Sequence, residues 1–359
     1  MDIFFLICLI PVTIAVAAKV RFQYEITWSE MAAQIAACAL VLGIILAAGT
    51  AFATSDQQVL NGRVTGKVRD HGHYVESYSC RCRSVKSGNS TTTRCDTCYR
   101  DHYTVTWSLK STLGDIAIDH KDRTSRSVYR SPDPDAYRNA KIGEHCAVME
   151  SYTNYVKAAP DSLFHKVGVV ADKVSVPEYP SVHDIYKITR VIPVGLKRDQ
   201  IMETLDEQLD NSLTTLGAKK QVNINVIITK SANRKYGDIV ENEWVGGKKN
   251  DVNIVINAPN YPKIDWVKVF TFGKTAQNNM VAVTIRNDLI NLGTLENPSM
   301  VSSIITSNVE RHFKRKSMKD YEYLKSEIQP PMWVIIFCVI LSIVMGCGLT
   351  YYFHKNETF

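Results

Sequence analysis

Residues 199–229, DQIMETLDEQLDNSLTTLGAKKQVNINVIIT, pass from a helix pattern directly into a strand pattern. Asp199 can cap a helix at its start, and Gly217 can close it. Between them, apolar residues recur every three or four positions: Ile201, Leu205, Leu209, Leu213 and Leu216. From residue 221 the apolar residues alternate instead, which puts one set on a single face of a strand: Val222, Ile224, Val226 and Ile228. The stretch predicts a helix–strand unit of an α/β fold.

The residues that follow continue this alternation of helices and strands. Gly246-Gly247 ends a short helix that carries Tyr236, Val240 and Trp244. Further strands are predicted at 251–256, 264–270 and 281–286, and Met300, Val301, Ile304, Ile305 and Val309 form the apolar stripe of a last helix. We expect a layered α/β domain over 196–328 in which Trp244 and Trp266 are buried. Its helices should cover 199–216, 235–245 and 299–313, on a sheet that includes 222–229 and 251–257.

Residues 54–160 predict a smaller, β-rich subdomain. Tyr103, Val105, Trp107 and Leu109 alternate with hydroxyl residues, which is the period of a half-buried strand. The SPDPD sequence at 131–135 predicts a turn or loop. Residues 161–195 are rich in Pro and Val without a clear period, and we expect them to link the two parts.

Apolar runs at both ends of the chain predict membrane anchoring. Residues 31–53 and 332–353 are long enough to cross a bilayer core of about 20 residues as helices. Residues 1–18 predict either another transmembrane helix or a cleaved signal peptide, since Ala-Val-Ala precedes Ala18-Lys19. Residues 19–30 would then be a short loop, and 354–359 a polar tail.

Flanking charges give conflicting indications of membrane orientation. Lys19 and Arg21 follow the first run, which favours a cytoplasmic loop at 19–30 and export of the central region. Residues 311–325 carry six Lys or Arg beside the last run, which favours the opposite side. Because long domains translocate largely regardless of charge, we expect an inner-membrane protein with an extracytoplasmic central region. The basic stretch could contact lipid headgroups or simply be a solvated helix face.

Four cysteines form the most specific pattern in the chain. Cys80 and Cys82 are separated by twelve residues from Cys95 and Cys98, across a polar loop between predicted strands. In a strand, Cys80 and Cys82 point to the same face, so both can reach one partner strand. We expect nested disulfides, Cys80–Cys98 and Cys82–Cys95, if the region is exported. The alternative is a tetrahedral zinc site formed by Cys80, Cys82, Cys95 and Cys98 if the region is cytoplasmic, and no other cofactor is expected.

Other chemical motifs are weak. His71 and His73 in the sequence DHGHY could bind a metal, but a solvated turn is the favoured interpretation. The sequence contains no nucleophile elbow, no P-loop and no His-Glu zinc protease motif. The formal net charge of +6 permits nucleic-acid binding, but no recognised motif supports it, and we expect none.

The layered domain resembles the TPM domain, a family of modules usually found beside a membrane. The matching segments are LDEQLDNSLTTLGAKKQVNINVIIT (205–229), YGDIVENEWVGGKKNDVNIVI (236–256) and IITSNVERHFKRKSMKDYEYL (304–324). The sequence departs from the family at KVFTFGKTAQNN (268–279), which lacks its Arg-rich strand and Gly-Tyr-Gly-type turn. The resemblance implies a weak cation site at Asp251, together with Asp199. The favoured interpretation of Asp251 is nevertheless a turn residue that caps a strand.

The β-rich part resembles uncharacterised membrane proteins of tailed phages and prophages. The residues that carry this resemblance are YSCRCR (78–83), CDTCYRDHYTVTWSL (95–109) and SYTNYVK (151–157). This resemblance brings no known activity. We expect a membrane-anchored, non-enzymatic interaction module that is phage-encoded and acts at the host envelope. Its expected partners are membrane lipid and another envelope protein, with a homo-oligomer as a further option. The TPM resemblance implies two alternatives: a phosphatase or other hydrolase, and an assembly or quality-control factor for a membrane complex.

Overall fold

The computed structural model describes most of the chain: residues 3–23, 25–87, 90–159, 175–272 and 275–356. The chain divides into two compact units. The helical unit comprises 1–56, 151–168 and 317–359. The sheet unit comprises 57–150 and 169–316.

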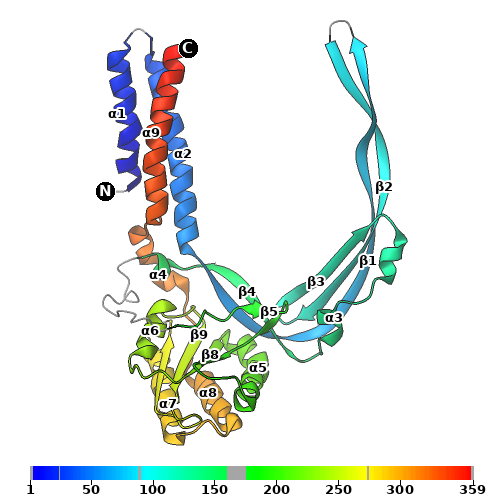
Figure 1. Cartoon of the computed structure of the whole chain (residues 1–359), viewed down its shortest axis with the longest axis vertical. Helices are drawn as coiled ribbons and strands as arrows, with labels where there is room; N and C mark the ends of the chain where they lie inside the picture. The colour runs from blue at the N-terminus through cyan, green and yellow to red at the C-terminus, as the bar shows by residue number, and fades with distance from the viewer. Residues whose placement is uncertain (1–2, 24, 88–89, 160–174, 273–274, 357–359) are drawn as a thin grey trace. The chain divides into compact units, whose positions relative to one another are not determined.

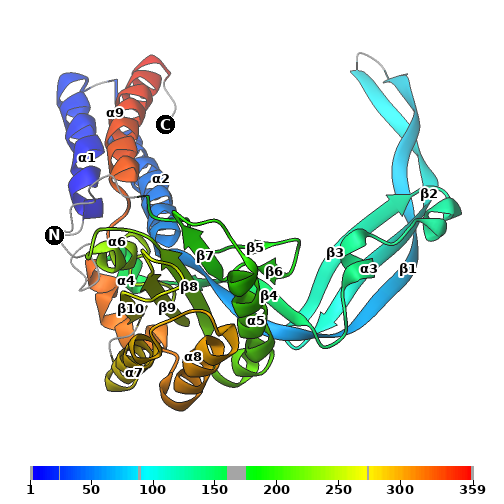
Figure 2. The same ribbon diagram turned by 60° about the horizontal axis from the view of Figure 1, so that its bottom comes forward.

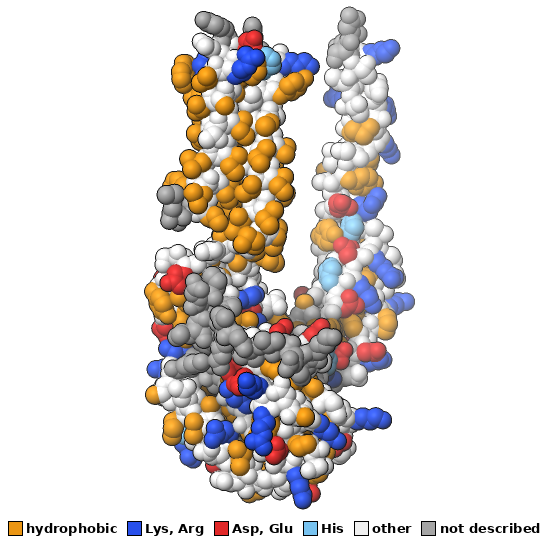
Figure 3. Space-filling view, turned by 60° about the vertical axis from the view of Figure 1, so that its left-hand side comes forward, with side chains coloured by type: hydrophobic (Ala, Val, Ile, Leu, Met, Phe, Trp, Pro, Cys, Tyr) orange, Lys and Arg blue, Asp and Glu red, His pale blue; other side chains and the backbone are white. Residues whose placement is uncertain are grey.

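Three apolar helices make up most of the helical unit: α1 (Ile3–Arg21), α2 (Trp28–Thr54) and α9 (Met332–Lys355). They share a buried core of Ile7, Leu42, Leu46, Val334 and Cys338. Their outer surfaces are also apolar, as Figure 3 shows. By length and composition, α1, α2 and the segment Met318–Lys355 that contains α9 can each span a membrane. The unit therefore has the character of a membrane anchor.

The helices of the anchor alternate in direction. In Figure 1, α1 and α9 run one way and α2 runs the other. The rings of Phe22 and His354 lie 4.4 Å apart, and His354 pairs with Glu25, so the α1–α2 loop and the end of α9 share one end of the bundle. The start of α1 lies at the other end. In this structure α1 packs against both α2 and α9. Retention of residues 1–18 as a helix and their cleavage as a signal peptide both stay predictions.

Close contacts fix the anchor internally. The buried Gln34 side chain donates a hydrogen bond from Nε2 to the carbonyl oxygen of Gly346, at 2.9 Å. At Gly49 an added Cβ would lie 2.8 Å from a methyl group of Val334. Small residues let membrane helices approach closely, and polar side chains can hydrogen-bond between them. Both features hold α2 against α9.

Two short polar elements complete the helical unit, beside the end of α2 and the start of α9. They are α4 (Tyr155–Ala158) and the 3-10 segment η2 (Met318–Glu327). Asp56 accepts hydrogen bonds from Tyr152 and Asn154, and Asn154 also caps α4. The Lys325 ammonium lies 5.5 Å from the centre of the Tyr155 ring. These contacts join segments that are distant in sequence.

The first sheet of the sheet unit has the strand order β3-β2-β1-β4. Its strands are β1 (Ser55–Ser87), β2 (Ser90–Ser111), β3 (Gly114–Arg123) and β4 (His145–Thr153). The 3-10 segment η1 (Arg126–Arg130) and α3 (Asp135–Asn139) follow β3. Val105, Trp107 and Leu109 are fully buried, which confirms the predicted alternation in β2. Trp107 and Val105 pack against Val128 of η1.

The second sheet has the order β10-β9-β8-β7. Its strands are β7 (Val191–Val194), β8 (Asn223–Thr229), β9 (Asp251–Asn257) and β10 (Trp266–Thr271). β7, β8 and β9 are parallel, and β10 is antiparallel to β9. A two-stranded hairpin of β5 (Val182–His183) and β6 (Lys187–Ile188) precedes them.

Helices cover both faces of this second sheet. They are α5 (Gln200–Lys220), α6 (Tyr236–Glu243), α7 (Ala276–Leu292) and α8 (Pro298–His312). One face shares a core with α5, α7 and α8, as Figure 2 shows, and the other packs against α6. Alternate residues of each strand therefore face different cores, for example Ile228 and Ile227. The predicted layered α/β arrangement is present.

The structure corrects three expectations for this region. Residues 281–286 were expected to form a strand but belong to α7, whose buried face is Val281, Ile285 and Leu289 at helical spacing. β7 lies within the stretch expected to be a linker and forms an edge of the sheet. Trp244 is buried, but Trp266, at the start of the edge strand β10, is only partly buried.

Candidate interaction site

Strands β1 and β2 continue well beyond the sheet to which they belong. β3 pairs with β2 only as far as Tyr103, opposite Arg123. Beyond that point, among the residues that the structure describes, β1 and β2 pair with each other and with no other strand, out to Ser87 and Ser90. We call residues 74–87 and 90–102 the distal ribbon, visible in Figure 1. At about 3.3 Å per residue it extends for about 45 Å.

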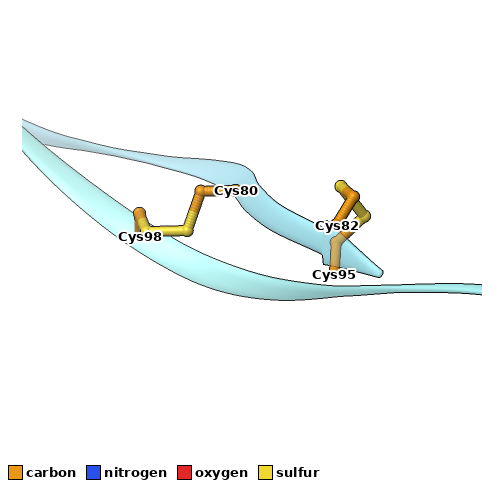
Figure 4. The surroundings of a disulfide bond; sticks show 4 residues. All are labelled: Cys80, Cys82, Cys95 and Cys98. Atoms are coloured by element: carbon orange, nitrogen blue, oxygen red, sulfur yellow. A yellow bond between two sulfur atoms is a disulfide. The ribbon is translucent and has the colours of Figure 1, made fainter. Parts of the chain in front are cut away.

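Two disulfides tie the strands of the distal ribbon together: Cys80–Cys98 and Cys82–Cys95 (Figure 4). Their Cα atoms lie 5.8 Å and 3.9 Å apart, respectively. The structure therefore has the nested pairing expected from the sequence. In the described part of the chain, no group of three or more His, Cys, Asp or Glu residues is placed to hold a metal ion.

A β-bulge makes the two pairings compatible. Cys95 and Cys98 are three residues apart, so they lie on opposite faces of β2. A regular β1 would keep Cys80 and Cys82 on one face, as the sequence analysis expected. The register instead shifts between Cys80 and Arg83, and Arg81 has a left-handed backbone with φ of 47°. The extra residue turns Cys82 toward Cys95.

The distal ribbon exposes large side chains on both faces. Tyr99 is 71% exposed and Val75 is 53% exposed, on the face opposite to Tyr78. The Arg100 guanidinium lies 4.6 Å from the centre of the Tyr78 ring. No described residue of the distal ribbon belongs to a buried core cluster. The disulfides and the backbone ladder therefore hold it in shape.

The base of the distal ribbon carries a network of ionisable groups. His102 lies between two carboxylates, with Nδ1 2.8 Å from Asp122 and Nε2 3.1 Å from Glu76, and its ring stacks on Tyr74. The hydrogen bond with Asp122, and then that with Glu76, raises the pKa of His102. Because the two carboxylates bond opposite sides of the imidazole ring, these three groups cannot converge on one ion.

His71 and His73 are in strand β1, not in the expected solvated turn. The His73 ring stacks on Tyr103, and its Nε2 lies 2.8 Å from Asp101. The His71 ring packs against Tyr129 of η1 at 4.8 Å. The two histidines therefore have separate partners on the ribbon surface.

Asp199 and Asp251 do not form a common cation site. Asp199 follows the C-terminal end of β7, where it caps α5 and accepts a hydrogen bond from Tyr261. Asp251 begins β9. Because β7 and β9 both run parallel to β8, Asp251 lies at the N-terminal ends of these strands, whereas Asp199 follows a C-terminal end. The buried Asp251 instead accepts hydrogen bonds from Tyr179 and Asn223. Burial raises the pKa of Asp251.

A buried polar cluster around Arg190 was not anticipated from the sequence. Arg190 is fully buried, and its Nε donates to Asp210 of α5 at 2.6 Å. Its Nη1 donates to Asn223 of β8 at 2.5 Å, and its Nη2 contacts Asn61 of β1 and His145 of β4. The cluster thus joins the two sheets. The signal in the sequence is a charged residue directly before an apolar strand, RVIPV.

Burial controls the ionisation of this cluster. Burial, and then the positive charge of Arg190, lowers the pKa of His145 to about 2. Burial raises the pKa of Asp210 to about 6, although Arg190 opposes the shift. His145 Nδ1 lies 3.3 Å from Asp210, and its Nε2 lies 3.1 Å from Arg190 and 3.0 Å from Asn61 Oδ1, so both ring nitrogens have polar partners. The buried polar groups of the cluster hydrogen-bond to one another, as a structural joint between two sheets requires.

Comparisons of the chain with protein-family models, with curated proteins and with solved structures found no match.

Proposed function

We propose that this chain is a membrane-anchored, non-enzymatic interaction module, phage-encoded and acting at the host cell envelope, with the distal ribbon as its contact element. The observation that carries the proposal is a ribbon about 45 Å long that has no core and is closed by two disulfides. Isolated two-stranded hairpins are marginally stable in water. Cross-links that keep such a hairpin extended have a clear use if its surface binds a partner.

The side chains of the distal ribbon support this role. Tyr99, Val75 and Tyr78 are exposed, and none of them belongs to a buried core cluster. Tyrosine is enriched at protein interfaces because its ring supplies contact area at a small cost in conformational entropy. A rigid backbone lowers the cost of binding further. The contact element would therefore be preorganised.

The disulfides also support an orientation. Disulfides persist outside the cytoplasm and are reduced inside it. Lys19, Arg21 and Lys355 gather at the end of the bundle that carries the α1–α2 loop, as expected for a cytoplasmic end. We therefore place the sheet unit on the extracytoplasmic side of the inner membrane. The six basic residues in 311–325 oppose this orientation, but they flank a long domain, where the charge rule is weak.

The TPM resemblance remains part of the proposal for residues 196–328. The sheet with helices on both faces supports it, and the helix at 281–286 replaces one strand of the expected order. The hydrolase alternative has no comparable support, because Asp199 and Asp251 lie at opposite ends of the parallel strands. A TPM-like domain would act here as the scaffold that carries the distal ribbon.

Photocrosslinking from the distal ribbon tests the proposal. A photoreactive phenylalanine analogue would replace Tyr99 in the full-length chain, expressed in host membranes. The control position is Met300 on α8, which is also exposed. We expect a discrete adduct from position 99 that is lost when Cys82 and Cys95 are changed to Ser, and none from position 300. Equal labelling from both positions, or no adduct from position 99, would contradict the proposal.

A further inference from the structure

The tip of the distal ribbon has an unbalanced positive charge. Between Cys80 and Cys95 the sequence contains Arg81, Arg83, Lys86 and Arg94 and no acidic residue. Arg83 is paired directly opposite Arg94. Side chains at such positions are about 5 Å apart at Cβ, and like charges there destabilise a ribbon. The tip thus carries an unfavourable pair that a bound anion would relieve.

No group in the described chain neutralises this pair. Among the described residues, neither Arg83 nor Arg94 has an ionic partner, whereas Arg100 lies over the Tyr78 ring. Asp96 lies two residues from Arg94 on the same face of β2, opposite Cys80, but it forms no ion pair with either arginine. The guanidinium groups of Arg83 and Arg94 are therefore free to bind a ligand. Arginine binds phosphate with two parallel hydrogen bonds.

The charges lie on both faces of the distal ribbon. Arg83 and Arg94 share a face with Tyr78, while Lys86 is opposite Thr91 on the other face. Figure 3 shows Lys and Arg side chains along the distal ribbon. A single complementary protein patch would contact one face, whereas a layer of headgroups can surround both. Exposed tyrosines also suit the interface between headgroups and hydrocarbon.

We infer that the tip of the distal ribbon binds the phosphate headgroups of an anionic phospholipid bilayer. The inference depends on the proposed function, because it names the partner class of the same contact element. Each basic residue near an anionic surface strengthens binding by about fivefold, from about 1 kcal/mol per charge. The attraction is screened by salt. The chain would therefore hold an anionic membrane surface through the distal ribbon.

A vesicle flotation assay tests this inference. The full-length protein is placed in nanodiscs of phosphatidylcholine and mixed with vesicles of phosphatidylcholine, with or without phosphatidylglycerol. We expect flotation only with phosphatidylglycerol, and its loss at high salt. The double variant Arg83→Gln/Arg94→Gln should bind about 25-fold more weakly. The control Lys197→Gln/Lys230→Gln removes two exposed charges from the second-sheet part of the unit and should bind as the unchanged protein does.

The outcomes separate this inference from the proposed function. Disulfide mapping of the double variant checks that a loss of binding does not come from a misfolded ribbon. Equal flotation with both vesicle types, or unchanged binding by the double variant, would overturn the lipid inference. If the probe at position 99 then captured a discrete protein, the proposed function would stand with another partner. If neither assay gave ribbon-dependent binding, both would fail.

Discussion

Arg190 and Asp210 form an ion pair, 2.6 Å from Nε to Oδ1, at the point where the two sheets of the sheet unit meet. The Arg190 side chain is completely buried, and it also bonds to residues of β1 and β8. The pair gives the distal ribbon a fixed base, because β1 continues from this joint into the ribbon.

Removal of Arg190 should destabilise the sheet unit strongly. Arg190→Met leaves Asp210 and Asn223 without their buried partner, and the loss of one member of such a pair costs about 3–5 kcal/mol. Lys219→Met is the matched control, since Lys219 pairs with Glu310 at the surface, where a pair contributes about 0–1 kcal/mol. Denaturant unfolding of the full-length protein in detergent measures both. Equal stability of the two variants would show that the joint does not support the fold.

The same cluster predicts opposite pH dependences for two variants. The pKa of His145 is near 2 in the fold and about 6.5 when unfolded, so its contribution to stability is lost as pH falls below 6.5. The pKa of Asp210 is near 6 in the fold and about 3.9 when unfolded, so its contribution is present at low pH and is lost as pH rises through 6. Between pH 6 and 4 the changes that His145 and Asp210 make to the free energy of unfolding are opposite in sign and nearly cancel.

Relative to the unchanged protein, His145→Asn should therefore gain about 1.4 kcal/mol per pH unit as pH falls from 6 to 4. The free energy of unfolding of Asp210→Asn should fall by a similar amount over the same pH range, relative to the unchanged protein. Unfolding free energies at several pH values give both slopes. Parallel slopes for the two variants would show that the cluster does not hold these protonation states.

Within the anchor, Gly49 should tolerate no large side chain. In Gly49→Leu the new Cβ would meet Val334 of α9 at 2.8 Å, and overpacking costs about 1–3 kcal/mol. Gly348→Leu is the control on α9, because no atom lies within 4 Å of its added Cβ. Thermal stability in detergent should fall for the first variant alone. Similar midpoints for both variants would place the α2–α9 contact elsewhere.

The outer disulfide should control the order of the ribbon tip. Cys82→Ser/Cys95→Ser opens a link that spans 13 residues, and a loop of that size is stabilised by about 3 kcal/mol. Trypsin should then cleave rapidly after Arg83 and Arg94, while the region around the buried Trp107 stays resistant. Resistance of the tip in the variant would mean that the backbone ladder alone keeps it folded.

The sequence predicts the elements whose apolar pattern has a single interpretation. The spans, α5 and β8 follow from unbroken apolar runs, from the Leu stripe and from strict alternation. Residues 281–286 mislead because VAVTIR contains β-branched residues, and only the neighbouring Leu289 reveals the helical period. β7 is too short, at four residues, to stand out in a Pro-rich stretch.

The site is predictable only where its geometry is local. Nested cysteine pairs across a hairpin follow from spacing, but the bulge at Arg81 follows only if Cys95 and Cys98 are recognised as facing opposite sides. The charged residue that begins RVIPV marks Arg190, but the partners of the Arg190 cluster are as far apart as Asn61 and Asn223, so no local pattern identifies them. The position of Arg83 opposite Arg94, with no acidic partner for either, likewise depends on the register of the two strands.

We propose that a disulfide-closed ribbon on the extracytoplasmic side is the contact element of this membrane protein. Mass spectrometry of the chain, alkylated in intact host membranes without reduction, tests it most directly. We expect peptides linked as Cys80–Cys98 and Cys82–Cys95, with Cys146 unlinked. Four alkylated thiols at Cys80, Cys82, Cys95 and Cys98, with zinc released in proportion to protein, would contradict it and place the ribbon in the cytoplasm.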